Sequence, residues 1–178
     1  MPQNIIEGCI NGEKEAQFQF YKLYAKAMYN ICYRITNNAS DAEDALQEAF
    51  ISAFKNMNQF EGRSSVGSWL KKIVVRQALR YVQKSRIEWQ ELQSEHLYVS
   101  EDENGDTDYV KDISRIRSAL QQLPDGYRII FSLYLLEGYD HGEIAQILNI
   151  SESTSKSQYN RAKKKIKEIL KEEVYHER

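Results

Sequence analysis

The feature that most constrains this chain is an acidic stretch in its middle that has no apolar periodicity. Residues 88–112 contain nine acidic side chains and one lysine. Within it, residues 101–108 cannot bury enough apolar area to offset the entropy lost on ordering, so we expect a flexible linker. The sequence therefore predicts a first domain over residues 1–90, an acidic linker over 91–111 and a second domain over 112–178.

Both parts that flank the linker have helical patterns. Only 2 prolines and 8 glycines occur in 178 residues, which favours helices over a turn-rich β-fold. Apolar residues recur largely at three- and four-residue spacing, as on the buried side of a helix. In the first domain this predicted stripe comprises Phe18, Tyr21, Leu23, Tyr24, Met28, Ile31, Cys32 and Ile35. We therefore predict an all-α fold of two small helical domains joined by the flexible acidic linker.

Short polar residues mark the expected helix starts. Ser40 with Glu43, and Asp140 with Glu143, both match the spacing of a capping box. Ser151 is a third candidate cap, for a last helix that reaches about residue 172. A further helix is expected over residues 66–86. The predicted core stripe of the second domain includes Tyr127, Ile130, Phe131, Tyr134 and Leu135, and ends at Gly138.

The strongest local pattern is a helix-turn-helix that begins at Glu143. A short helix, a turn of about four residues containing Asn149, and a second helix capped by Ser151 fit this unit. In such a unit the second helix lies in the DNA major groove, where polar side chains contact bases and basic ones hold phosphates. The inward side chains would be Tyr159, Ala162, Ile166 and Ile169. The alternative is a solvated amphipathic helix that ends a helical domain.

Charge is distributed in blocks, although the formal net charge is only −2. Residues 68–86 contain six basic side chains and no acidic one, and residues 156–171 contain seven basic side chains and one acidic one. Two separate basic blocks indicate two contacts with a polyanion. Trp69 and Tyr81 lie within the first block, as is typical of proteins that bind single-stranded DNA. A tryptophan on a helix is, however, more often part of a core, and Trp69 is expected to be mostly buried.

A catalytic or metal-binding interpretation has little support. Four acidic residues lie close together in the sequence, at Asp41, Glu43, Asp44 and Glu48, but no histidine is near them. This acidic face is either solvated or binds a protein. The chain has no glycine-rich phosphate loop and no nucleophile with a base partner, and its two cysteines lack metal-ligand spacing. We therefore expect no enzyme activity, no catalytic residues, no cofactor and no metal.

No apolar run approaches the roughly 18 residues that span a bilayer. The N-terminus also lacks the basic-then-apolar pattern of a secretory signal. The sequence therefore predicts a cytoplasmic protein that is not inserted in a membrane.

Three motifs stand out together: residues 41–50 read DAEDALQEAF, residues 60–70 read FEGRSSVGSWL, and residues 143–151 read EIAQILNIS. In these motifs the chain resembles the extracytoplasmic-function (ECF) group of bacterial RNA polymerase sigma factors. Thr154 to Ser157 and the pair Arg161-Ala162 extend the third motif. The motifs occur in the family's order and cover most of the chain outside the linker.

The resemblance implies a role for each motif. The first would bind the clamp helices of core RNA polymerase, through Asp41, Asp44, Gln47, Glu48 and Phe50. The second would recognise and melt the promoter −10 element, with a loop that captures a flipped base. Its residues would be Phe60, Arg63, Ser64, Ser65, Trp69, Lys71, Lys72, Arg76 and Arg80. The helix-turn-helix would recognise the −35 element through Ser153, Thr154, Lys156, Ser157, Asn160, Arg161 and Lys164.

The function implied is that of an alternative sigma factor, with core RNA polymerase, promoter DNA and an anti-sigma factor as partners and no small-molecule substrate. Ser155 departs from the family's pattern, because it replaces a customary valine. We expect this to weaken packing under the recognition helix by roughly 1 kcal/mol. The rival hypotheses are an autonomous helix-turn-helix regulator, which would bind duplex DNA without polymerase, and a helical adaptor that binds only proteins.

Overall fold

The computed structural model describes residues 3–84 and 109–176 of the 178-residue chain. The chain divides into two compact units, residues 1–86 and 87–178. The described residues of both units form helices and turns and contain no β-strand. The predicted all-α fold with two helical domains is therefore confirmed. Most of the predicted acidic linker, residues 91–111, lies outside the described residues.

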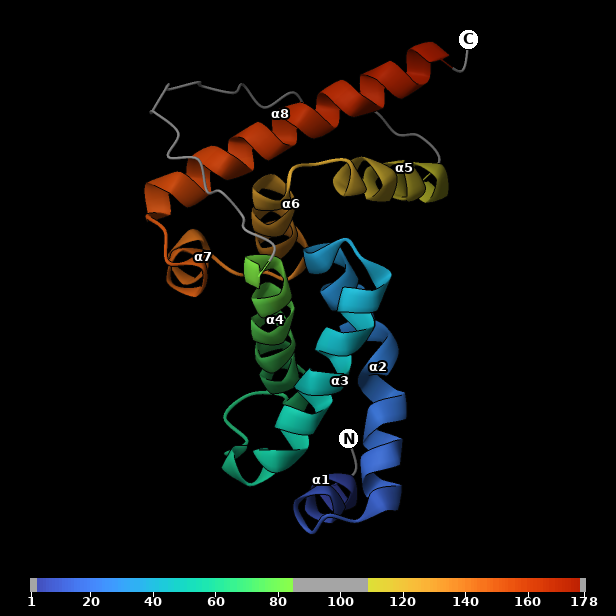
Figure 1. Ribbon diagram of the computed structural model, residues 1–178, viewed down its shortest axis with the longest axis vertical. Coiled ribbons are helices and arrows are strands. Elements are labelled where there is room, and N and C mark those ends of the chain that lie inside the picture. The colour runs from blue at the N-terminus through green and yellow to red at the C-terminus, as the bar shows by residue number, and fades with distance from the viewer. Residues whose placement is uncertain (1–2, 85–108, 177–178) are drawn as a thin grey trace. The chain divides into compact units, whose positions relative to one another are not determined.

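The N-terminal unit is a helical bundle. Its elements are α1 (Gln3–Ile10), α2 (Lys14–Thr36), α3 (Ala39–Lys55), a 3-10 turn (Met57–Gln59) and α4 (Val66–Lys84). Helices α2, α3 and α4 lie side by side, and each contacts the other two (Figure 1). Helix α1 packs against α2.

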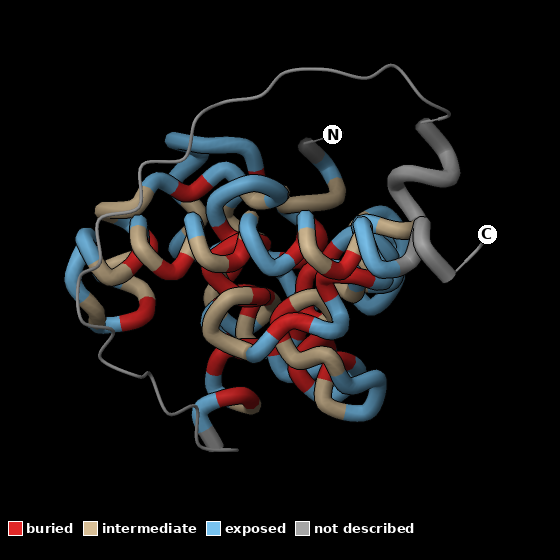
Figure 2. Tube along the Cα trace, turned by 90° about the horizontal axis from the view of Figure 1, so that it is seen from above, coloured by how far each residue is buried: buried red, intermediate tan, exposed pale blue. Residues whose placement is uncertain are grey.

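Aromatic rings form the centre of this bundle. Phe20 is 0% exposed, and its ring centroid lies 5.0 Å from that of Tyr24, 6.1 Å from that of Phe50 and 5.8 Å from that of Phe54. Tilted and edge-on rings at these separations contribute beyond the area that they bury. Buried and exposed positions alternate along the helices, as Figure 2 shows.

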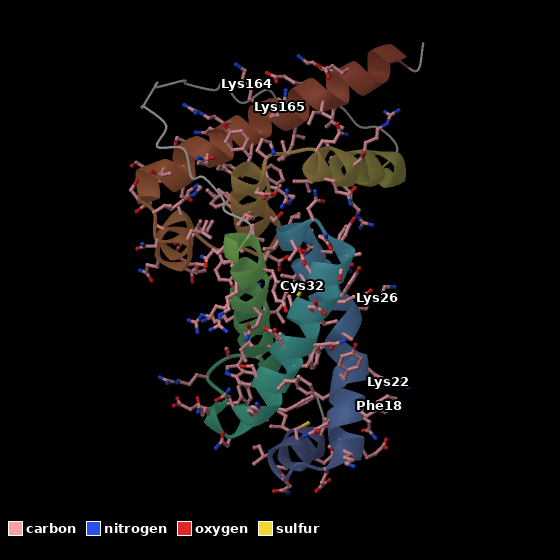
Figure 3. The ribbon with its side chains drawn as sticks, in the orientation of Figure 1. Phe18, Lys22, Lys26, Cys32, Lys164 and Lys165 are labelled. Atoms are coloured by element: carbon pink, nitrogen blue, oxygen red, sulfur yellow. The ribbon has the colours of Figure 1, made fainter. Side chains whose placement is uncertain are left out.

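The predicted buried stripe along α2 is correct in its second half and wrong in its first. Its buried members are Met28, Ile31, Cys32 and Ile35. Phe18 and Leu23 are instead 56% and 59% exposed. Phe18 and Lys22 lie on the side of α2 away from α4 (Figure 3), with the Lys22 Nζ 5.3 Å from the centroid of the Phe18 ring. The first half of α2 instead buries Ala16 and Phe20, which the prediction left out. These two residues lie one helical turn apart and therefore share a face.

Asn38, and not Ser40, caps α3. The Asn38 backbone is extended, and its side-chain oxygen accepts a hydrogen bond from the Asp41 backbone N–H at 3.1 Å. Ser40 lies inside the first turn, because α3 begins at Ala39. The predicted capping box of Ser40 and Glu43 is therefore wrong. Asn37, in the left-handed conformation with φ 53°, ends α2 one residue earlier.

The C-terminal unit is built around its last helix. Its elements are α5 (Tyr109–Gln121), α6 (Asp125–Phe131), a π-helical turn (Ser132–Leu136), α7 (His141–Leu148) and α8 (Glu152–His176). Helices α5, α6 and α7 each pack against α8. One core cluster comprises Ala119, Leu120, Leu123, Phe131, Ala162, Ile166 and Ile169. None of the described helices in either unit is both long and apolar enough to cross a membrane.

A buried arginine ties α6 to the turn that follows α5. Arg128 is 2% exposed, pairs with Asp125 at 2.6 Å and donates a hydrogen bond to the Leu123 carbonyl at 3.2 Å. The core stripe predicted here ends earlier than expected, since Tyr134 and Leu135 are 37% and 54% exposed. Both lie in the π-helical turn, whose wider winding shifts the positions that follow away from the core.

Candidate functional site

The acidic face of α3 is the first cluster of predicted site residues. Asp44, Gln47 and Glu48 are exposed, and Asp41 is partly exposed. The Tyr81 hydroxyl on α4 donates a hydrogen bond to Glu48 Oε1 at 2.8 Å. This bond, together with some burial and the nearby negative charges of α3, raises the pKa of Tyr81 to about 12. The α3 face therefore holds several carboxylates together, and one of them is fixed in position by the neighbouring helix.

Phe50, the fifth residue predicted to bind polymerase, is buried, unlike the exposed residues of this face. Its side chain is 3% exposed and packs in the core, with ring centroids 4.8 Å from Tyr21 and 5.9 Å from Phe54. A ring held in this way supports the helix from inside and is not available to a partner. The next residue, Ile51, is 53% exposed and was not anticipated. Successive helical residues are rotated by about 100°, so one position separates core from surface.

The loop before α4 brings two aromatic rings together. Phe60 and Trp69 are both half-buried, with ring centroids 5.6 Å apart. Trp69 is therefore less buried than predicted. Between them, Gly62 has φ +72°, in the left-handed region where glycine is favoured. The Gly62 turn lets the chain reverse over a short distance, and the two rings pack at its base.

Serines and one ion pair shape the rest of this loop. The Ser65 hydroxyl accepts a hydrogen bond from the Ser68 backbone N–H at 3.1 Å, which caps the start of α4. Ser64 and Ser65 are exposed. The Arg63 side chain is 84% exposed and pairs with Glu61. The loop thus presents polar groups and a cation to solvent.

A basic stripe continues from this loop along α4. Lys72, Arg76 and Arg80 are exposed and follow Trp69 at spacings of three, four and four residues, so they share one face. Arg80 donates a hydrogen bond to the Gln77 side chain at 3.2 Å. Lys71 lies about 100° away from this stripe and is partly exposed. The structure therefore brings together three of the four predicted basic residues of α4 and sets Lys71 beside them.

The helix-turn-helix is present with the predicted local geometry. At the start of α7, the Glu143 N–H donates to Asp140 Oδ1 at 2.7 Å, and the Asp140 N–H donates to Glu143 Oε2 at 3.0 Å. Asn149 has φ 55° and ψ 48°, the left-handed conformation expected of the turn. The Ser151 hydroxyl then accepts a hydrogen bond from the Thr154 N–H at 3.0 Å, which caps α8. The predicted capping box, the turn and the last cap are all confirmed.

The solvent side of α8 gathers the predicted −35 residues. Ser153, Lys156, Asn160 and Lys164 are exposed, and Thr154, Ser157 and Arg161 are partly exposed. Lys156 pairs with Glu152 at 2.6 Å, one turn earlier. Lys164 and its neighbour Lys165 project from α8 in Figure 3. The opposite side is closed by the core cluster, which contains three of the four predicted inward residues, Ala162, Ile166 and Ile169.

A polar contact between α7 and α8 was missed by sequence reasoning. Ser155 is 0% exposed, and its hydroxyl lies 2.9 Å from the His141 Nδ1. The His141 ring stacks on Tyr134 at 4.3 Å and meets Tyr159 edge-on at 5.7 Å. Burial, followed by the positive charge of Lys156, lowers the pKa of His141, although Glu152 and Asp140 oppose the shift. The His141 ring therefore bridges the two helices.

No cluster of three or more histidine, cysteine, aspartate or glutamate side chains that could hold a metal occurs among the described residues. Cys9 and Cys32 are both buried free thiols, and burial raises the pKa of each, that of Cys32 to about 12. A thiol with so high a pKa is a poor nucleophile near neutral pH. The surfaces described above offer charge and hydrogen bonds to a macromolecular partner.

Comparison with known proteins gives two family matches, one in each unit. Residues 20–87 match sigma-70 region 2, and residues 113–166 match sigma-70 region 4. The first match contains the α3 face, the loop and the basic stripe, and the second contains the helix-turn-helix.

Individual relatives and solved structures agree with these matches. The ECF RNA polymerase sigma factor SigW of Bacillus subtilis is 26% identical over 172 residues, covering 90% of this chain and 92% of that protein. The sigma factor RpoE of Bartonella quintana, solved in complex with the anti-sigma factor NepR, has a TM-score of 0.56 at 23% identity and covers 86% of this chain and 95% of that one. CnrH, solved in complex with the cytosolic domain of CnrY, has a TM-score of 0.54 at 18% identity, covering 94% and 95%. At such sequence identities, the likeness to these two structures supports the fold alone.

Proposed function

This chain belongs to the extracytoplasmic-function group of the sigma-70 family, and we propose that three of its surfaces divide the work of transcription initiation between them. As an alternative sigma factor, the chain directs core RNA polymerase to specific promoters and is not itself an enzyme. The polymerase and the chromosome share the cytoplasm of a bacterium, so that is where we propose that it acts.

We propose that the exposed face of α3 binds core RNA polymerase. Asp41, Asp44 and Glu48 give the face a negative charge that would steer it to a basic partner surface, and Gln47 adds hydrogen-bonding capacity. The Tyr81 hydrogen bond holds Glu48 in one geometry before binding, which reduces the entropy lost on docking.

The loop of residues 60–65 and the basic stripe of α4 would take the melted −10 element. A base stacked in a duplex cannot be reached, so recognition here requires a flipped base. Exposed Ser64 and Ser65 offer hydrogen bonds, and the Phe60–Trp69 pair offers aromatic surface, while Lys72, Arg76 and Arg80 would neutralise successive phosphates. Lys71, set beside the stripe, would contribute charge at its edge.

The first turns of α8 would recognise the −35 element. The observation that supports this most is the capped turn from Asn149 to Ser151, which starts α8 so that Ser153 and Asn160 are exposed and Thr154 and Ser157 are partly exposed. Ser153, Thr154, Ser157 and Asn160 are short enough to reach base edges. Lys156, Arg161 and Lys164 would hold the flanking phosphates.

An anti-sigma factor is the remaining proposed partner. Its support is the group to which the chain belongs and the similar fold of RpoE, which was solved in complex with the anti-sigma factor NepR. The test is addition of a purified candidate from the same genome to a transcription reaction that depends on this chain. Loss of the transcript, reversed by excess chain, supports the proposal, and an unchanged transcript speaks against that candidate.

Run-off transcription tests the proposed division of surfaces. Purified core RNA polymerase from the source organism would be combined with the full chain and genomic promoter fragments. The double variant Lys156→Ala/Arg161→Ala should lower −35-dependent transcription while leaving polymerase binding intact. The double variant Asp44→Lys/Glu48→Lys should abolish polymerase binding. Tight binding of duplex DNA by the chain alone, with no transcript and no co-elution with core polymerase, would instead favour an autonomous helix-turn-helix regulator.

A further inference from the structure

Helix α3 exposes one large apolar side chain, and its position is informative. Ile51 is 53% exposed, directly after the buried Phe50. Asp44, Gln47 and Glu48 precede it by seven, four and three residues, spacings that place them on the same side of the helix. Lys55, also exposed, follows by four residues. Ile51 therefore lies in the middle of the charged face, with polar side chains around it.

Single exposed apolar residues are common, so exposure alone decides little. Two observations distinguish Ile51. Its backbone is held rigidly, because Phe50 beside it is anchored among Phe20, Tyr21 and Phe54 at centroid distances of 4.8 to 6.1 Å. One of the polar side chains around it, Glu48, is also held in place, by the 2.8 Å hydrogen bond that the Tyr81 hydroxyl donates. An apolar centre within a pre-positioned polar rim is the arrangement of an interface hot spot.

We infer that Ile51 is the apolar anchor of the α3 face and inserts into an apolar recess on a basic surface of core RNA polymerase. This inference rests on the proposed role of α3 in polymerase binding. The carboxylates of Asp44 and Glu48 imply basic groups around that recess, by charge complementarity. The polar rim then excludes water from the contact that the isoleucine makes, which is how a central apolar residue dominates affinity.

The experiment measures the affinity of the labelled full-length chain for purified core polymerase. Ile51→Ala should weaken binding by about tenfold or more, the effect of a hot-spot truncation. The matched control is Leu23→Ala. Leu23 is 59% exposed, but it lies on α2 two residues after Tyr21, whose ring contacts Phe50 of α3, and so it lies on another side of α2. The control should bind within twofold of the unaltered chain.

Salt separates the apolar contribution from the charged one. Because apolar burial is not screened, the factor lost through Ile51→Ala should be the same at low and high ionic strength, whereas the effect of Asp44→Lys/Glu48→Lys should shrink as salt is added. Ile51 is an exposed residue, so the variant should fold, which circular dichroism checks.

Each outcome has one meaning. A salt-independent tenfold loss for Ile51→Ala with an unaffected Leu23→Ala supports the anchor. If the charge reversals abolish binding but Ile51→Ala binds as the unaltered chain does, the anchor is refuted and the proposed polymerase face stands. If the charge reversals also leave binding intact, the proposed face itself is wrong, and the inference falls with it.

Discussion

Replacing Ser155 with alanine should loosen the contact between α7 and α8 by about 1 kcal/mol. The Ser155 hydroxyl is fully buried and lies 2.9 Å from the His141 Nδ1. A hydrogen bond of this kind contributes a net 0.5 to 1.5 kcal/mol, roughly. The substitution removes the hydroxyl and no carbon, so little is added by a change in packing.

The same substitution should have a different effect when His141 is already alanine. In that background the Ser155 hydroxyl is buried without its histidine partner, and an unsatisfied buried hydroxyl costs about 1 to 3 kcal/mol. Removing it should then be neutral or stabilising. The double-mutant cycle therefore predicts a coupling energy of about 1 to 2 kcal/mol between the two side chains.

Amide hydrogen exchange in the full chain measures this effect locally. A loss of about 1 kcal/mol should accelerate exchange in α7 and the first turns of α8 by roughly fivefold. The N-terminal unit supplies an internal control, since its amides should exchange unchanged. Equal acceleration by Ser155→Ala in both backgrounds would refute the reasoning, because it would show that the hydroxyl acts through its own helix and not through His141.

Three further predictions concern the cap of α3, the buried arginine and the bridging histidine. Asn38→Ala should destabilise α3 by about 1 kcal/mol, whereas Ser40→Ala should be close to neutral. Hydrogen exchange of the first α3 amides measures both effects. A larger loss of stability for Ser40→Ala than for Asn38→Ala would identify Ser40 as the cap. Asp125→Ala should cost about 2 kcal/mol, because it leaves the buried Arg128 guanidinium without its carboxylate, and an unchanged exchange rate in α6 would contradict this. The pKa of His141 lies below its usual value of 6.5, so the unfolded chain takes up a proton more readily than the folded one. Stability should therefore fall as pH drops from about 6.5 to the folded pKa, with little change from this group above pH 7. Titration of the histidine ring by NMR checks this, and a midpoint at or above 6.5 would contradict the lowered pKa.

Local patterns made the helix-turn-helix predictable. The capping box of Asp140 and Glu143, the left-handed Asn149 and the cap of Ser151 each depend on residues no more than four positions apart. Backbone preference and short-range hydrogen bonding decide such features without help from the rest of the fold. The exposed face of α8 was predictable as well, because the first residue of the helix and the helical period together determine which side chains point outward.

Two kinds of feature were not predictable: contacts between residues far apart in the sequence, and helix caps for which two neighbouring residues are equally suitable by type. His141 and Ser155 are 14 residues apart, and no local rule joins them. The sequence therefore suggested only lost packing at Ser155, where the structure has a hydrogen bond. At α3, Asn38 and Ser40 are both good caps by residue type, and the first residue of the helix decides between them. The π-helical turn at Ser132–Leu136 likewise changed the phase of a stripe that a regular period had extended too far.

The difference between Phe50 and Ile51 shows what a motif can and cannot transfer. A motif gives the identity of residues along the chain, but a core role and a surface role can both require an apolar side chain. The residues that surround each position decide between these roles: Phe20, Tyr21 and Phe54 enclose Phe50, whereas Ile51 is left in water. If the face of α3 were only a set of charges, its partner could be any basic surface. An aliphatic side chain at its centre requires in addition a recess of matching shape, and shape complementarity of that kind selects one partner among many that are similarly charged.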